Sequence, residues 1–275
     1  MRKSKALPFS VRLAFCPKEI YNGNHDFTNW TVNPMTLFLT SSPCIYDHSP
    51  ATLNPANGFL ARLRAALPEK PRVLNICSDP KDHAQTEYYA QDMAAAFRRA
   101  GIDFKTCRVL DSRSKDRAKQ WIAESDLIIL MGGHVPTQNQ FFQEIGLKEL
   151  LKDYPGVIMG ISAGTMNAAE TVYAQPESDG ETAPSFRRFY PGLGLTKLMV
   201  CPHYQQVRDW VLDGKKLYGE ITQADSRLGH PFHIFPDGTY IYKDDKTHAI
   251  YGKCWRMCDG ITELLCDDGG HIDLK

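Results

Sequence analysis

The sequence has no excess of charge of either sign. It contains 32 Lys and Arg residues against 32 Asp and Glu residues, so the formal net charge is zero over 275 residues. Proteins that bind nucleic acid usually carry a basic excess, and we therefore expect no nucleic-acid partner. Long apolar runs are missing too: the stretch 127–131 (LIILM) is far shorter than the ~20 residues of a membrane-spanning helix. We expect a protein that does not enter the membrane and acts on a small molecule or a peptide.

The chain also lacks the marks of secretion and of a metal site. Pro8 and Arg12 interrupt the apolar stretch near the N-terminus, and no small-residue cleavage site follows it, so we expect mature sequence and a cytoplasmic location. The eight cysteines are scattered, and the one close pair, Cys254 and Cys258, is too far apart on an extended strand to form a disulfide. Paired Cys or His spacings typical of zinc are absent. We expect free thiols, no metal and no cofactor.

What the sequence does contain is a regular alternation of strand and helix patterns. Hydrophobic residues make up 43% and charged residues 23%, as in globular proteins, and the length suits one large domain. Apolar strand-like segments occur at residues 35–40, 72–77, 104–110, 126–131 and 156–160, separated by helical patterns at 58–67, 86–100, 114–124 and 138–153. This order predicts an α/β fold, a doubly wound and mostly parallel sheet with helices on both faces, in a single domain spanning residues 1–275.

The pattern changes after residue 174. The polar stretch 175–188 predicts a surface loop, and strand 198–201 and helix 206–223 are expected to follow it. Short strands are then expected at 232–235, 239–243, 249–254 and 261–266, as an antiparallel C-terminal extension of the same sheet. Residues 1–34 precede the first parallel strand, and the turn signal at 21–24 (YNGN) predicts an edge hairpin.

The most informative segment is residues 160–164 (GISAG), which follow an apolar strand and open a helix of small residues expected at 165–171. A G-x-S-x-G turn between a strand and a helix is typical of a nucleophile elbow. Small residues on either side permit the sharp turn, which exposes the Ser162 hydroxyl at the carboxyl end of the sheet. The helix N-terminus directs backbone N–H groups at developing negative charge. A turn whose glycines serve packing alone is the simpler alternative.

A serine nucleophile needs a base and an acid that orients the base. His203 follows the short strand 198–201, at the edge of the sheet where strand ends meet, although it could also be a surface-loop histidine. Asp237 lies in the turn 236–238 (PDG). The pair Asp-Gly is common in turns that have no function. Gly132 and Gly133 end another strand, where the backbone can approach a ligand closely.

Together these residues resemble the peptidase E (aspartyl dipeptidase) and cyanophycinase family of serine peptidases, which has the fold of class I glutamine amidotransferases. The resemblance rests on residues 130–134 (LMGGH), 160–164 (GISAG), 201–204 (CPHY) and 236–238 (PDG), in that order, and it covers about residues 35–257. Residues 1–34 form an N-terminal extension that the short dipeptidases lack. The chain order of serine, histidine and acid separates this family from α/β-hydrolases.

The resemblance implies a peptidase that hydrolyses short peptides through a Ser-His-Asp triad and an acyl-enzyme. Ser162 would be the nucleophile, His203 the general base and Asp237 the acid that orients the base. The backbone N–H groups of Gly133 and Ala163 would form the oxyanion hole. The expected partner is a small peptide substrate, and the sequence is compatible with a homodimer.

The chain departs from the family pattern at several positions. Bacterial dipeptidases commonly have Glu at the position of Asp237, and Glu177 or Asp179, in the loop after the elbow helix, is an alternative acid that we rank lower. His134 replaces a frequent Asn, and Arg208 is the only early cation after the candidate base. We expect His134, Glu177 and Arg208 to contact the substrate, while a preference for N-terminal Asp does not follow from the sequence.

Two other functions are compatible with these residues. An esterase or acyl transferase would use the same triad, and a non-catalytic small-molecule-binding protein could keep the fold. The second is disfavoured because Ser162 and His203 are both present. A glutamine amidotransferase is disfavoured because that class has Cys at the elbow.

Overall fold

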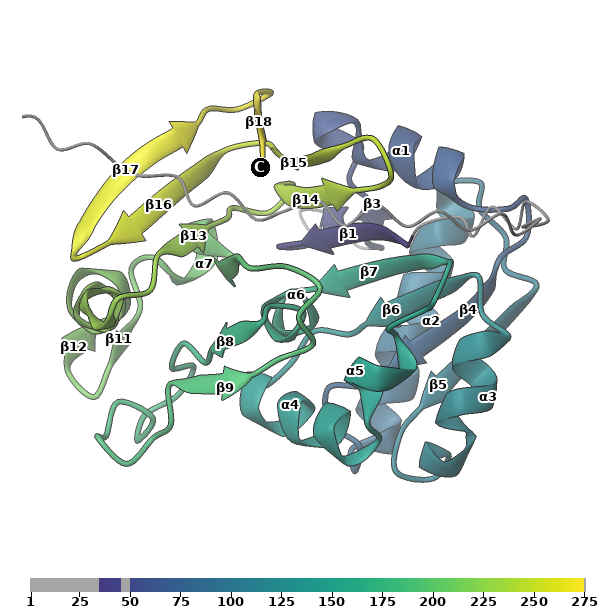
Figure 1. The fold of residues 1–275 in the computed structure, drawn as a ribbon, viewed down its shortest axis with the longest axis horizontal. Helices are drawn as coiled ribbons and strands as arrows, with labels where there is room; N and C mark the ends of the chain where they lie inside the picture. Colours follow the sequence, from purple (N-terminus) through teal and green to yellow (C-terminus); the bar gives the residue numbers. More distant parts are fainter. Residues whose placement is uncertain (1–34, 46–49, 275) are drawn as a thin grey trace, which may run out of the picture. The chain divides into compact units, whose positions relative to one another are not determined.

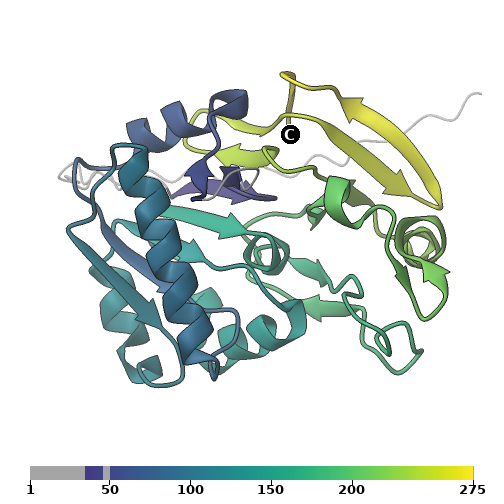
Figure 2. The same ribbon diagram turned by 180° about the vertical axis from the view of Figure 1, so that it is seen from behind.

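The structure is a computed structural model that describes residues 35–45 and 50–274. The predicted N-terminal extension 1–34 and its edge hairpin lie outside the described residues. Figure 1 shows a central twisted sheet with helices packed against it, and Figure 2 shows the same fold from behind. No helix in the described ranges is both long enough and apolar enough to cross a membrane.

The central sheet has eight strands in the order β18-β15-β14-β1-β7-β6-β4-β5. They are β1 (Thr36–Thr40), β4 (Arg72–Ile76), β5 (Thr106–Leu110), β6 (Leu127–Leu130), β7 (Val157–Ile161), β14 (Tyr240–Lys243), β15 (His248–Tyr251) and β18 (His271–Asp273). The adjacent strands β1, β7, β6, β4 and β5 are parallel to one another. On the other side of β1, the strands β14, β15 and β18 each pair antiparallel with their neighbours. The mostly parallel sheet predicted from the sequence is confirmed.

Helices cover both faces of this sheet, as predicted (Figures 1 and 2). α1 (Phe59–Ala66) and α2 (His83–Arg99) pack on one face, and α3 (Ala118–Ala123), α4 (Val135–Glu144) and α5 (Leu147–Leu150) pack on the other. α2 begins earlier than predicted because the Asp82 carboxylate accepts a hydrogen bond from the Gln85 backbone N–H at 3.1 Å. The predicted helix 138–153 is two helices, since Gly146 adopts a φ of 63° between them.

A second sheet contains the four strands β10 (Met199–Cys201), β13 (Phe232–Ile234), β16 (Cys254–Cys258) and β17 (Ile261–Cys266). The prediction that all C-terminal strands extend the central sheet is therefore wrong. The chain changes sheets at residues 236–238, so that β13 pairs with β10 while β14 pairs with β1. It changes sheets again at Gly252, with a φ of 100°, which divides the predicted strand 249–254 into β15 and β16.

The predicted helix 206–223 is also wrong. This segment contains the short helix α7 (Tyr204–Val207), the hairpin of β11 (Val211–Leu212) and β12 (Lys215–Lys216), and the π-helical η3 (Leu217–Thr222). Asp213 and Gly214 both have positive φ, 49° and 77°, which is the backbone of a tight hairpin turn. The Asp-Gly signal at this turn therefore overrides the helical periodicity of the segment.

Short elements complete the described chain. They are β2 (Cys44–Ile45), β3 (Thr52–Leu53), η1 (Ala56–Gly58), η2 (Lys115–Arg117), β8 (Thr171–Tyr173), β9 (Phe189–Pro191), α8 (Gln223–Asp225) and η4 (Ser226–Leu228). The elbow helix α6 (Ala163–Asn167) ends before the predicted residue 171, where β8 begins. The expectation of free thiols is confirmed for Cys77, Cys107, Cys201, Cys254, Cys258 and Cys266.

The elbow helix packs so closely on β6 that it tolerates no side chain at Gly164. A Cβ added there would lie 2.1 Å from the Leu130 carbonyl oxygen, which is backbone and cannot move aside. Gly160 is similarly crowded, since its added Cβ would lie 3.0 Å from the backbone of Thr165. These contacts hold the first turn of α6 against the carboxyl ends of β6 and β7.

We expect Gly164→Ala to destabilise the fold by about 1–3 kcal/mol or more, because overpacking against rigid backbone outweighs the better helix propensity of alanine. Urea unfolding followed by circular dichroism measures the effect. The matched control is Gly219→Ala in η3, where the added Cβ meets only ordinary contacts at 3.7 Å. A Gly164→Ala protein as stable as the control would contradict this account of the packing.

Candidate active site

Ser162 sits at the tip of a strained turn between β7 and α6. Its φ and ψ are 49° and −111°, a backbone conformation that non-glycine residues rarely adopt. The turn is held in place because the Ser162 N–H donates to the carbonyl oxygens of Thr40 and Ser41, at 3.2 and 3.1 Å. Thr165 adds a hydrogen bond from its hydroxyl to the same Thr40 carbonyl, at 2.7 Å. Strain of this kind persists where the surroundings over-determine it, as they do at functional sites.

His203 and Asp237 form a hydrogen-bonded pair at the ends of β10 and β13. Nδ1 of His203 lies 2.8 Å from Oδ1 of Asp237, and the two side chains are 26% and 14% exposed. Burial acts to raise the pKa of the Asp237 carboxyl, but the hydrogen bond and charge attraction from His203, with a further hydrogen bond from Ser41, outweigh it. The pKa of Asp237 therefore lies below its usual value. An ionised Asp237 holds the Nδ1 proton of His203 and leaves Nε2 free to accept one.

Ser41 connects this pair to the elbow. Its hydroxyl donates to Oδ1 of Asp237 at 2.8 Å and accepts a hydrogen bond from the His203 backbone N–H, also at 2.8 Å. Its carbonyl oxygen holds the Ser162 N–H. Ser41 is fully buried, and it follows β1, the strand that pairs with both β7 and β14. One residue thus fixes the relative positions of the candidate nucleophile, base and acid.

Ser162 and His203 open onto the same two cavities. One cavity has a volume of about 400 Å³ and the other about 240 Å³, and both are lined by Ser162, His203, Gly133 and Glu177. Among the described residues, neither the Ser162 hydroxyl nor Nε2 of His203 has a hydrogen-bond partner. Catalytic hydrogen bonds are often long before substrate binds, so this arrangement is compatible with a reacting pair.

Two backbone N–H groups beside Ser162 are also unpaired within the described part of the chain, those of Gly133 and Ala163. Gly133 has a φ of 149°, and a Cβ there would lie 2.3 Å from the Ser78 hydroxyl oxygen, so only glycine fits this position. Ala163 begins α6, where the helix leaves its first N–H groups without internal acceptors. Gly133 lines both cavities, whereas Ala163 is buried and lines neither of them. Unpaired backbone N–H groups next to a nucleophile are suited to binding an oxyanion.

Glu177 and His134 both line the larger cavity, and Glu181 contacts both of them. The Glu181 carboxylate accepts a hydrogen bond from the Glu177 N–H at 2.7 Å, and its other oxygen lies 3.1 Å from Nε2 of His134. Although part of Glu177 is exposed, desolvation by surrounding protein raises its pKa to about 7, and the nearby charge of Glu181 adds to the shift. Glu177 has no hydrogen bond to His203 among the described contacts.

Two other residues singled out from the sequence lie elsewhere. Asp179 accepts a hydrogen bond from the Asp213 backbone N–H at 2.8 Å, so it is held by the β11–β12 turn rather than by His203. The Arg208 guanidinium pairs with the adjacent Asp209 at 3.0 Å, and Arg208 lines neither cavity at Ser162. Nothing in the described structure supports a substrate contact for Arg208.

Sequence reasoning missed Ser41 and Gln206. Gln206 Nε2 donates to Oδ2 of Asp237 at 2.8 Å, so both oxygens of this carboxylate are held. The segment 41–43 (SSP) has the composition of an ordinary loop, and a glutamine two or three residues after a histidine carries no pattern of its own. The one available signal for Ser41 was its position directly after the first parallel strand.

We expect Ser41→Ala to raise the pKa of Asp237, because the carboxylate loses a donor that favours its charged form. It should also cost about 1–3 kcal/mol of stability, since the buried His203 N–H loses its acceptor. Carboxyl ¹³C NMR titration measures the pKa. Ser42→Ala is the control, because within residues 35–45 and 50–274 the Ser42 hydroxyl bonds only to Cys44. An unchanged Asp237 pKa in Ser41→Ala would refute this role.

The raised pKa of Glu177 predicts a pH dependence of folding stability. The unfolded chain loses this proton near pH 4.5 and the folded chain near pH 7. The contribution of Glu177 is therefore fully present below pH 4.5 and is lost as the pH rises through about 7. Glu177→Gln should remove this decline, and Glu181→Gln should move it to lower pH. Urea unfolding between pH 4 and pH 8 tests both, and a Glu177→Gln protein with the wild-type decline would contradict the assignment.

Comparisons with known proteins bear on the family and the fold of this chain. The sequence model of peptidase family S51 matches residues 48–249. A peptidase from an acI-B1 Actinobacterium has a similar structure, with a TM-score of 0.59 and 17% identity over 88% of this chain and 98% of that one. A putative peptidase E protein from Listeria monocytogenes EGD-e gives a TM-score of 0.52 and 18% identity over 84% of this chain and 99% of that one.

No curated protein gives a significant match. At these identities the two structures establish the fold, which is the class I glutamine amidotransferase-like fold expected from the sequence. The family is established by the sequence match, which covers most of the chain. The protein belongs to peptidase family S51.

Proposed function

We propose that this family member is a serine peptidase that cleaves short peptides, with Ser162 as nucleophile, His203 as general base and Asp237 as the acid that orients it. The observation that carries the proposal is the 2.8 Å hydrogen bond between His203 Nδ1 and Asp237, made by a histidine that shares two cavities with the elbow serine. Family membership supports peptide hydrolysis as the reaction.

The chemistry follows from the protonation states. Asp237 keeps the proton of His203 on Nδ1, so Nε2 can take the proton of the Ser162 hydroxyl as its oxygen attacks the scissile carbonyl. The same Nε2–H then protonates the leaving amine, and the peptide C–N bond breaks to give an acyl-enzyme. Water, deprotonated by Nε2, attacks the ester, and the acid product leaves with Ser162 restored.

The unpaired N–H groups of Gly133 and Ala163 would stabilise the intermediate. The carbonyl oxygen gains negative charge as the tetrahedral centre forms, and two fixed backbone donors need no reorganisation to meet it. Removing one such donor in other hydrolases costs on the order of 10²–10³ in rate. The narrow space at Gly133 supports this role, because a Cβ there would collide with Ser78 and only glycine keeps this backbone conformation beside Ser162.

The test is covalent labelling with a small fluorophosphonate, which reacts with activated serines, followed by intact-mass measurement. We expect one label on the wild-type protein and none on Ser162→Ala. Asp237→Asn should slow labelling by around 10⁴, the effect of an amide that stabilises the wrong histidine tautomer. Glu177→Gln should slow it far less.

Each alternative gives a different result. Labelling of Ser162→Ala at the wild-type rate would remove Ser162 from the mechanism. If labelling is strongly slowed in Glu177→Gln but nearly as fast as wild type in Asp237→Asn, the orienting acid lies in the loop 175–188. Labelling at Ser162 without cleavage of any peptide in a mixed dipeptide set, but with cleavage of simple esters, would identify an esterase instead.

A further inference from the structure

Two cysteines lie directly opposite each other in the second sheet. Cys254 is the first residue of β16 and Cys266 is the last residue of β17, and the two are partners in the antiparallel register. Directly opposite residues of an antiparallel pair have Cα atoms about 4.5–5.5 Å apart. A disulfide joins Cα atoms that are about 4.4–6.8 Å apart, so the backbone here has the spacing that this bond requires.

The two side chains also lie on the same side of the sheet. Cys254 is a buried member of the core cluster that contains Ile250, and Cys266 packs against the same cluster. Burial raises the pKa of the Cys254 thiol to about 12, and the nearby Cys266 thiol adds to the shift. Because the strands already pair and the thiols face the same core, a bond between the sulfurs requires rotation of the side chains and no shift in register.

Contacts on either side of the two cysteines hold the strands in this register. The Lys253 ammonium lies 2.8 Å from the Asp267 carboxylate, one residue beyond each cysteine. The Gly252 N–H donates to the Gly270 carbonyl oxygen at 2.9 Å. The chain passes between the two sheets here, from β15 to β16 and from β17 to β18 (Figure 1). A bond at this position would fasten the β16–β17 hairpin at its base.

The arrangement is particular to this pair within residues 35–45 and 50–274. The other cysteines in strands have apolar residues as their register partners. Cys44 is opposite Leu53, Cys107 is level with Val73, Cys201 is level with Ile234, and Cys258 is opposite Ile261.

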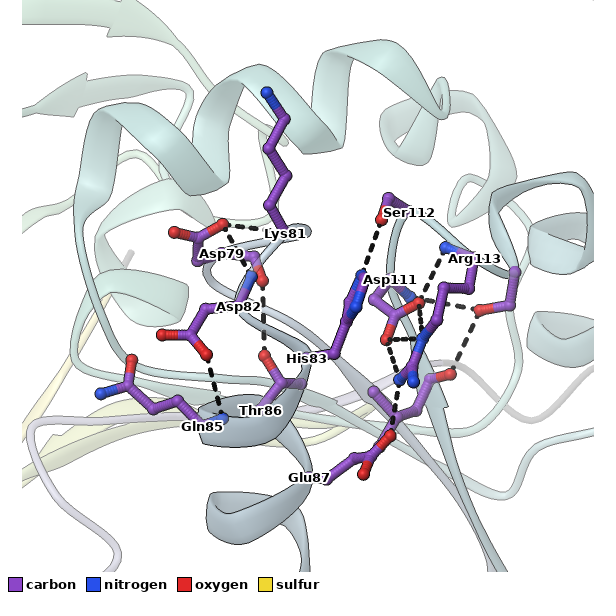
Figure 3. A network of polar contacts seen from close by, with 12 residues as sticks. Asp79, Lys81, Asp82, His83, Gln85, Thr86, Glu87, Asp111, Ser112 and Arg113 are labelled. Atoms are coloured by element: carbon purple, nitrogen blue, oxygen red, sulfur yellow. Dashed lines mark hydrogen bonds and ion pairs between the residues drawn. The ribbon is translucent and has the colours of Figure 1, made fainter.

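Cys77, which directly follows β4, has carboxylates near its thiol. Its side chain is fully buried. Burial raises the pKa of this thiol to about 12, and the charges of Asp111 and Asp79 add to the shift. Figure 3 shows both aspartates in a polar network at the start of α2, where Asp111 pairs with Arg113 at 2.6 Å. A buried thiol that stays protonated is a poor nucleophile, so Cys77 is not expected to react.

The two opposed cysteines differ in accessibility, and this difference sets the order in which they react. Cys254 is 0% exposed, whereas Cys266 is half-buried. A small disulfide from solvent can therefore reach the sulfur of Cys266 and not that of Cys254. The raised pKa of Cys254 disfavours its attack on molecules in solution, but an attack on Cys266 is intramolecular, which offsets this disadvantage.

We propose that Cys254 and Cys266 form a reversible disulfide when the folded protein meets a small-molecule disulfide such as oxidised glutathione. The Cys266 thiolate first attacks one sulfur of oxidised glutathione, whose S–S bond breaks, and one reduced glutathione leaves. The Cys254 sulfur then attacks the sulfur of Cys266, and the second glutathione leaves with the proton of Cys254. Two protein thiols are oxidised, and one oxidised glutathione is reduced to two thiols.

The bond should stabilise the folded protein. It closes the hairpin from residue 254 to residue 266 and so restricts the unfolded chain, while the existing register keeps the folded state free of strain. For a chain of this size we expect the midpoint of thermal unfolding to rise by about 5 °C on oxidation. The proposal is independent of the proposed peptidase function, because it involves neither Ser162 nor His203.

The experiment treats the folded full-length protein with mixtures of reduced and oxidised glutathione, up to oxidised glutathione alone. The remaining thiols are alkylated, and intact mass and peptide mapping locate each bond. The variants are Cys266→Ser and Cys254→Ala. The matched control is Cys258→Ser, which removes another partly exposed thiol from β16, one that is opposite Ile261.

We expect wild type and Cys258→Ser to give a peptide pair joined through Cys254 and Cys266, which dithiothreitol separates again. Cys254→Ala should stop at the mixed disulfide and carry one glutathione on Cys266. Cys266→Ser should leave Cys254 free for alkylation after unfolding. The unfolding midpoint should rise on oxidation in wild type and in Cys258→Ser, and in neither of the other two variants. If Cys254→Ala fails to fold, Cys266→Ser decides alone.

Three results would overturn the proposal. The first is wild-type protein in which Cys254 and Cys266 are both still free in oxidised glutathione alone. The second is a bond that joins either of them to a different cysteine or to a second chain. The third is an intramolecular Cys254–Cys266 bond that lowers the unfolding midpoint, because the folded register would then be incompatible with the bond.

Discussion

The buried hydroxyl of Ser41 is the contact on which the geometry of the candidate site depends. β1 lies between β7 and β14 in the central sheet, so its carboxyl end adjoins both the elbow and the turn that carries Asp237. Ser41 uses its carbonyl group toward the elbow and its hydroxyl toward His203 and Asp237. Because His203 has a positive φ of 56°, its backbone needs such an external hold. Ser162, His203 and Asp237 come from distant parts of the chain, and the contacts of Ser41 at the end of β1 hold them close together.

The second sheet explains how Asp237 comes to lie beside His203. The turn 236–238 leaves β13 in one sheet and enters β14 in the other, so its backbone lies at the junction of the two. The Asp237 carboxylate is then held on one oxygen by His203 and Ser41 and on the other by Gln206. Donors on both oxygens compensate for the burial that would otherwise favour the neutral acid.

Local patterns were sufficient to predict the parallel core and the elbow, but not the pairing of the later strands. The elbow glycines and the apolar strands before them leave strong local signals, because sterics at Gly160 and Gly164 admit no other residue. The split into two sheets depends on which strand each later segment pairs with, and that choice is made over long sequence separations. The prediction of a helix at 206–223 was wrong because Asp213 and Gly214 form a tight turn with positive φ, although the apolar residues of the segment have helical spacing. Ser41 was missed because its role exists only in the packed sheet, and no spacing in the chain records it.

The environments of Asp237 and Glu177 shift the pKa values of two carboxyl groups at the candidate site in opposite directions. Hydrogen bonds and the attraction of His203 hold the pKa of Asp237 below its usual value, whereas desolvation and the charge of Glu181 raise the pKa of Glu177 to about 7. Near pH 6 the first group is an anion and the second is mostly neutral. In the proposed mechanism, only an anion could stabilise the imidazolium that would form when His203 takes the serine proton. A neutral carboxyl at the rim can donate a hydrogen bond to a substrate carbonyl and becomes an acceptor as the pH rises. The divergence of the two pKa values, rather than distance alone, separates the acid suited to orient the base from the acid suited to meet the substrate.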